Sequence, residues 1–167
     1  YHDIDILLKW TEISEKEAGV NDPASFPAFC AAVCLGKIYT KTHNETCVSR
    51  LKELANDGRW RMREAVAFGF QIIGENSFEN LKSIFKGWIN QTNNLEKRAI
   101  LAALAHPKFL NEHNAEFCFG MTDIIMNTMG RDDGSDVLKK GLSFVISVFT
   151  AANPHKGFEF MEKWISH

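Results

Sequence analysis

The sequence predicts an all-α protein, a right-handed α-α superhelix in which antiparallel helix pairs are stacked. Apolar residues recur three and four positions apart along most of the chain, and no segment shows the sustained alternation that marks a strand. Polar turns divide the chain into helix–turn–helix units that repeat about every 34 to 42 residues, a period typical of helical solenoids. In each unit a helix that is apolar over a wide arc precedes a helix with one apolar stripe.

These boundaries define one repeat domain over residues 1–167. We expect a first helix over about residues 3–17 and helix pairs over about residues 25–56, 60–90, 95–129 and 135–166. The first helix has apolar residues at Ile4, Leu7 and Leu8, and a breaking segment with Gly19 and Pro23 follows it. In the first pair Ser25 is the expected N-cap, and Pro27 lies in the first turn, where its missing N–H removes no helical hydrogen bond.

The helix that follows Asp57 is the centre of the pattern. Asp57 is its candidate cap, three arginines surround its first turn, and two apolar stripes follow, one containing Met62 and the other Phe68. A helix that is apolar over so wide an arc is expected to be covered on more than one side. Its partner over 78–90 has a single stripe that includes Trp88, so we expect this tryptophan in the core.

Two further pairs repeat this arrangement. Leu95–Leu104 and Val137–Ala152 are again apolar over wide arcs, and each precedes a partner helix. Aligning Arg63, Lys97 and Lys139 brings the small residues Ala65, Ala99 and Gly141 into register, which favours close approach of neighbouring helices. In the last helix the expected inward stripe is Phe158, Met161 and Ile165. Phe160 and Trp164 lie off this stripe and are expected to face a partner or a missing cap.

Composition narrows the class of protein. The chain has 167 residues, 45% of them hydrophobic, and a formal net charge of -2, so neither a strongly basic nor a strongly acidic partner is indicated. We expect a cytoplasmic protein without membrane spans, because the longest apolar run contains Lys139 and Lys140 and is shorter than the roughly 20 residues a span needs. The four cysteines form no C-x-x-C pair and are expected to be reduced thiols.

With a basic, a small and an aliphatic residue at matched places, the chain resembles the HEAT-type, armadillo-like α-solenoid superfamily. The residues that carry this resemblance are Trp60-Arg61-Met62-Arg63-Glu64-Ala65-Val66-Ala67 and Glu96-Lys97-Arg98-Ala99-Ile100-Leu101. The chain is also similar to the HEAT-like DNA alkylation-repair glycosylases. That likeness implies a basic concave cleft in which tryptophans, an arginine and a carboxylate meet the damaged nucleotide. Arg98 stands where the arginine is expected and Phe144 where a cleft tryptophan is expected, and no Asp or Glu is assigned to the carboxylate position.

The candidate binding residues gather at the starts of two wide-arc helices. They are Arg59, Trp60, Arg61, Arg63, Lys97 and Arg98. One interpretation is a patch that contacts phosphates, with Trp60 as a platform on which a base stacks. The other is ion pairing with Asp57, Glu64 and Glu96, because cations beside the positive end of a helix need compensation.

No residue pattern predicts catalysis, a metal or a cofactor. Cys30 and Cys34 share a helix face without a second ligand pair, and residues 132–136 lack the alternating ligands of a calcium loop. The favoured function is therefore a non-enzymatic scaffold that binds a protein or peptide on one face. The alternative is a protein that binds duplex DNA or repairs alkylated DNA. Neither the partner's identity nor the oligomeric state follows from the sequence.

Overall fold

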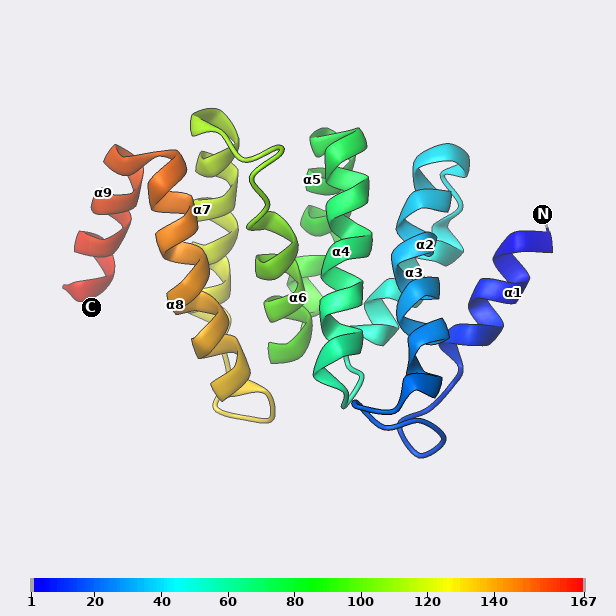
Figure 1. Cartoon of the computed structure of the whole chain (residues 1–167). Coiled ribbons are helices and arrows are strands. Elements are labelled where there is room, and N and C mark those ends of the chain that lie inside the picture. The colour runs from blue at the N-terminus through cyan, green and yellow to red at the C-terminus, as the bar shows by residue number, and fades with distance from the viewer. Residues whose placement is uncertain (1, 167) are drawn as a thin grey trace. The chain divides into compact units, whose positions relative to one another are not determined.

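The computed structural model describes residues 2–166, with side chains from residue 4 onward. As predicted, every regular element in this range is helical, and Figure 1 labels the nine α-helices. Their bounds are α1 (His2–Thr11), α2 (Phe26–Thr42), α3 (Glu45–Leu54), α4 (Trp60–Asn76), α5 (Phe78–Trp88), α6 (Asn94–Leu104), α7 (Glu112–Thr128), α8 (Ser135–Ala152) and α9 (Pro154–Ile165). Two short 3-10 helices, η1 (Pro23–Ser25) and η2 (Ile89–Gln91), precede α2 and follow α5.

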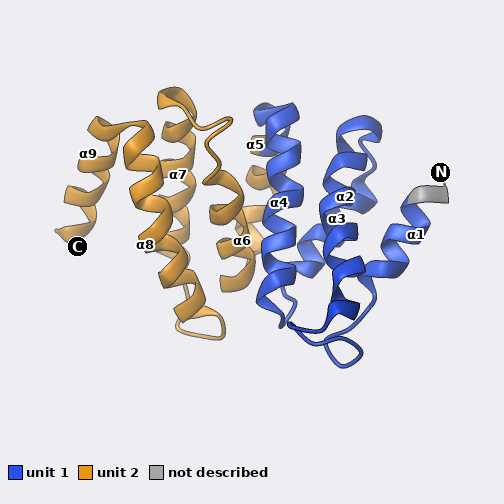
Figure 2. Cartoon of the chain, in the orientation of Figure 1, with its two compact units in different colours: residues 1–81 blue, residues 82–167 orange. Residues whose placement is uncertain are grey.

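The helices belong to two compact units, which Figure 2 shows in blue and orange. Unit 1 comprises residues 1–81 and unit 2 comprises residues 82–167, so α5 contributes residues to each.

In unit 1, helix α2 packs against α1, α3 and α4, and α2 and α4 lie side by side (Figure 1). Ala28 and Ala32 of α2 and Ala65 of α4 are small and fully buried. A Cβ atom on Gly36 of α2 would lie only 2.1 Å from the carbonyl oxygen of Gly69 in α4. The two backbones therefore touch at this point, and only glycine fits at Gly36.

In unit 2, helix α6 packs against α7 and α8, and α8 also contacts α9. The core contains Ile100 and larger aromatic side chains. The ring of Phe119 lies 5.9 Å from that of Phe149 and 5.1 Å from that of Phe160. Aromatic pairs at this separation add stability beyond the area they bury.

The first helix is shorter than predicted. It ends at Thr11, where Arg50 of α3 donates hydrogen bonds to the Thr11 carbonyl oxygen at 2.9 Å and hydroxyl at 2.8 Å. Residues 14–17 instead form a turn in which the Glu17 carboxylate accepts from the backbone N–H and the hydroxyl of Ser14. Ser25 makes no side-chain cap, because η1 precedes α2 and Asp22 caps that short helix.

The inward face predicted for α9 is wrong. Phe160 is buried, whereas Phe158 and Ile165 are exposed. The physical reason is Gly157, whose missing side chain lets α9 approach Thr150 of α8 so closely that an added Cβ would lie 2.4 Å from the Thr150 hydroxyl oxygen. Phe160 lies three residues after this contact and shares its helix face. Trp88, by contrast, is buried as predicted.

Within the described part of the chain, no helix combines the length and the apolar character needed to cross a membrane. All four cysteines are free thiols.

Candidate functional site

Arg59, the first of the predicted binding residues, is part of the core of unit 1. Its side chain is 1% exposed and pairs with Asp57, with 2.7 Å between Nη2 and Oδ2. Nη1 also donates to the carbonyl oxygen of Ala18 at 3.0 Å, and Nη2 donates to that of Ile13 at 2.8 Å. Of the carboxylates that the ion-pairing interpretation names, Asp57 pairs with Arg59, and the Arg59 side chain is used within the fold.

These bonds fix a long connection. Arg59 holds residues 13–18, the segment after α1, against the start of α4. The hydrogen bonds that the guanidinium donates to the Asp57 carboxylate raise the pKa of Arg59 above its usual range, so Arg59 keeps its charge in the buried site. Asp57 also accepts a hydrogen bond from the Arg59 backbone N–H at 2.8 Å, which forms the turn that leads into α4.

Arg61 points to solvent, two residues further along. The helical rotation of about 100° per residue carries its side chain to a different side of α4 from Arg59. Its guanidinium lies over the ring of Trp60, 4.5 Å from the centroid, and half of the Trp60 side chain is exposed. Arg61 forms no ion pair with any residue that the structure describes.

The other predicted residues differ in their surroundings. Arg63 is half-buried and donates to the carbonyl oxygens of Asp57 and Gly58 at the start of α4. Lys97 of α6 is only 5% exposed, and its ammonium donates to the carbonyl oxygen of Thr128 at 2.6 Å. Arg98 is half-buried, and its aliphatic chain lies beside Gly141 of α8. Of the predicted set, Trp60 and Arg61 are the two exposed residues.

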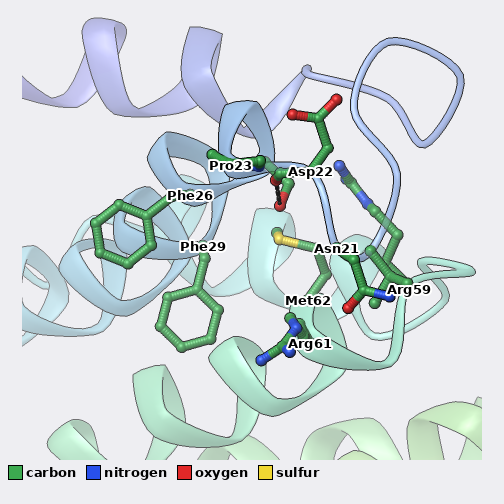
Figure 3. Close-up of a pocket in the computed structure, with 10 residues that line it drawn as sticks. Asn21, Asp22, Pro23, Phe26, Phe29, Arg59, Arg61 and Met62 are labelled. Atoms are coloured by element: carbon green, nitrogen blue, oxygen red, sulfur yellow. Dashed lines mark hydrogen bonds between the residues drawn. The ribbon is translucent and has the colours of Figure 1, made fainter.

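A cavity of about 300 Å³ lies beside Arg61. We call it the α2–α4 cavity, since the loop before α2 and the first turns of α2 and α4 form its walls. Its lining residues are Val20, Asn21, Asp22, Pro23, Ser25, Phe26, Phe29, Arg59, Arg61 and Met62. Figure 3 shows Asp22 and Pro23 on one side, Arg61 on the opposite side, and Phe26 and Phe29 on a third.

An aromatic row runs from this cavity across α2 to α4, and we define it as Phe26, Phe29 and Phe68. The rings of Phe26 and Phe29 are stacked, with their centroids 6.3 Å apart, and the Phe68 ring meets Phe29 edge-on at 6.2 Å. Phe26 is 65% exposed and Phe68 is 43% exposed. Exposed aromatic clusters of this kind are typical of interaction sites.

Sequence reasoning missed this row. It assigned Phe68 to an apolar stripe that should be covered, and Phe29 to the body of a packed helix. The wide apolar arc of α4 was the available signal. When a helix is apolar over so wide an arc, its neighbours can leave part of that arc exposed.

A second cavity, of about 390 Å³, lies in unit 2 between α7 and α9. Here the charges are compensated within the protein. Lys163 pairs with Asp123, Lys156 pairs with Glu159, and the indole N–H of Trp164 donates to Asp123 at 3.1 Å. The exposed cation of the α2–α4 cavity has no such carboxylate, so that cavity is the better candidate for a ligand.

Among the residues that the structure describes, no group of three or more His, Cys, Asp or Glu side chains is arranged to hold a metal ion. Comparisons of this chain with protein-family models, curated proteins and solved structures find no match.

Proposed function

We propose that this chain is a non-enzymatic helical-repeat scaffold that binds a segment of a protein partner. The observation that carries the proposal is the aromatic row, in which three rings touch in sequence and the two outer ones are largely exposed. Burying a phenylalanine side chain contributes about 1.5 to 3 kcal/mol, so two exposed rings offer a substantial part of a binding energy. Aromatic residues are also enriched among the side chains that dominate protein interfaces.

A repeat architecture of the HEAT type is part of this proposal. Its support is that helices two apart in the chain pack together within each unit, α2 with α4 in unit 1 and α6 with α8 in unit 2. Stacked helix pairs produce contacts of this kind, and α-solenoids commonly use the resulting faces to bind partners.

The DNA-binding alternative has weaker support. A phosphate-contacting patch needs accessible cations, and Arg59 and Lys97 are buried and donate to carbonyl oxygens of the fold. Arg98 and Phe144, the residues that the likeness to glycosylases points to, both belong to unit 2, whereas the aromatic row belongs to unit 1.

The test is a selection of random short peptides displayed on phage. The wild-type chain is compared with a Phe26→Ser/Phe68→Ser double variant and with a matched control, Phe144→Ser/Phe158→Ser. The control removes two phenylalanines of similar exposure, 64% and 60%, from unit 2. We expect selected peptides to bind the control as they bind the wild type and to lose at least about tenfold in affinity for the Phe26/Phe68 variant.

Peptides that bind all three proteins equally would overturn the proposal, because the aromatic row would then contribute nothing. Binding to duplex DNA is measured in parallel at two salt concentrations, with base release from alkylated duplex as a second readout. Affinity that falls steeply with salt, without any peptide that depends on the row, would favour the DNA-binding alternative. Base release would identify the repair reaction.

A further inference from the structure

We propose that the α2–α4 cavity and the aromatic row select an extended peptide segment with apolar side chains at alternate positions and an acidic side chain beside them, which Arg61 binds. This inference rests on the proposed function and names the chemistry of the partner segment.

The acidic preference follows from the charges around the cavity. Asp57 neutralises Arg59, and the carbonyl oxygens of Asp57 and Gly58 accept from Arg63. Arg61 is held over the Trp60 ring instead. A guanidinium stacked on an aromatic face still has its edge N–H groups available in the ring plane, where a carboxylate accepts two parallel hydrogen bonds. Arg61 is therefore preorganised for a carboxylate that none of the described residues supplies.

The apolar preference follows from the other walls. Phe26, Phe29 and the buried Met62 line a space of about 300 Å³. This volume is at the lower end of the range for small-molecule pockets, and it suits one or two side chains of a peptide better than a cofactor. Anchor side chains at interfaces occupy pockets of this kind.

The spacing of the rings indicates an extended segment. Neighbouring centroids of the aromatic row are 6.3 Å and 6.2 Å apart. Side chains on one face of an extended peptide are about 6.6 Å apart, because each residue advances the chain by about 3.3 Å. Two apolar side chains at alternate positions of such a peptide can therefore pack against the row, one between Phe26 and Phe29 and the next between Phe29 and Phe68.

The far side of the cavity sets the direction of the segment. Asp22 lies on the side of the cavity opposite Arg61 (Figure 3), and its carboxylate points away from Arg61 and accepts from the Ala24 N–H with one of its oxygens. A carboxylate of the partner is attracted to Arg61 and repelled by Asp22, so the acidic residue lies at the Arg61 end.

The experiment is a peptide selection on three proteins: the wild type, Arg61→Glu and Lys41→Glu. The control Lys41→Glu makes the same change in net charge on an exposed residue at the other end of α2. We expect peptides selected on the wild type and on Lys41→Glu to be enriched in Asp or Glu next to apolar residues at alternate positions. Arg61→Glu should reverse the preference to Lys or Arg and should lower the affinity of wild-type peptides by at least about tenfold.

Each other outcome overturns the inference. Peptides that depend on Phe26 but show no acidic enrichment, or whose enrichment is unchanged by Arg61→Glu, would remove the role of Arg61 while the proposed function stands. If no selected peptide depends on Phe26, the proposed function fails as well. Tighter binding of a single-stranded oligonucleotide than of any peptide would assign the row to stacked bases. Because Arg61 is exposed, an unchanged urea unfolding midpoint checks that its variant folds.

Discussion

Among the described residues, each unit buries one cation near the start of a helix, and the two cations stabilise different connections. In unit 1 Arg59 has its own carboxylate, Asp57, and donates to the carbonyl oxygens of a loop. In unit 2 Lys97 donates to the Thr128 carbonyl oxygen at the end of α7, where the helix dipole favours a positive charge. These two basic residues at helix starts thus join segments of the fold, and their sequence positions alone are no evidence for a nucleic-acid surface.

The two units also differ in how helices two apart in the chain pack together, α2 with α4 in unit 1 and α6 with α8 in unit 2. In unit 1 the backbones of α2 and α4 meet at Gly36 and Gly69. In unit 2 the glycine of α8, Gly141, faces the aliphatic chain of Arg98 of α6. Unit 1 therefore depends on the absence of a side chain at this contact, and unit 2 has a long side chain there. Variants that remove one feature at a time test whether this contrast governs stability.

The largest effect is expected for Arg59→Met. The variant keeps much of the side-chain volume and leaves Asp57 and the carbonyl oxygens of Ile13 and Ala18 without their donor. Removing one member of a buried ion pair costs about 3 to 5 kcal/mol, and we expect a loss of this size in the free energy of unfolding, measured in urea. Arg61→Met is the control and should change it by less than about 0.5 kcal/mol, because Arg61 is exposed. Equal losses for the two variants would contradict the structural role of Arg59.

The second largest effect is expected for Gly36→Ala, which should lower the free energy of unfolding by about 3 kcal/mol, the upper end of the usual cost of overpacking. The added methyl group would overlap the backbone of Gly69, which cannot move aside as a flexible side chain can. The control is Gly120→Ala on α7, where an added Cβ has no neighbour within 4 Å. This control should be neutral or stabilising by up to about 1 kcal/mol, because alanine favours a helix more than glycine does. A Gly36→Ala protein as stable as wild type would mean that the α2–α4 contact is loose.

The helical class followed from the sequence because the period of apolar residues is a local property. Helices α2 to α9 also begin and end within a few residues of the predicted ranges. The inward face of α9 was wrong because Phe158, Met161 and Ile165 fit a helical stripe as well as the face that packs, and the choice depended on Gly157 meeting Thr150. The site was predicted in part. Trp60 and Arg61 are exposed, but the burial of Arg59 depends on carbonyl oxygens 41 and 46 residues away in the chain, which no local pattern reveals.

Lys97→Met should cost less than Arg59→Met, about 2 kcal/mol in the free energy of unfolding. The ammonium donates a hydrogen bond of 2.6 Å to the carbonyl oxygen of Thr128, and hydrogen bonds to charged groups contribute about 1.5 to 3 kcal/mol. The control Lys140→Met, on the exposed face of α8, should stay within about 0.5 kcal/mol of wild type. A loss as large as that of Arg59→Met would show that the two buried cations contribute equally to the free energy of unfolding, which would contradict the expected difference between the units.

The smallest expected effect is on which unit opens first, and the labelling rates of the buried cysteines measure it. Cys47 is buried in unit 1 and Cys118 in unit 2, and burial raises the pKa of both thiols, that of Cys118 to about 12. A raised pKa means little reactive thiolate at pH 8, so each thiol should react with a disulfide reagent when its unit opens, while the exposed Cys34 reacts at once.

We expect Arg59→Met to accelerate the labelling of Cys47 relative to Cys118 by about tenfold, and Lys97→Met to have the opposite preference, with peptide mass spectrometry identifying the labelled thiol. This selectivity requires that the connection held by each cation is local to its unit. If both variants accelerate both thiols by the same factor, the two units unfold as one cooperative body, and each buried cation then stabilises the whole chain.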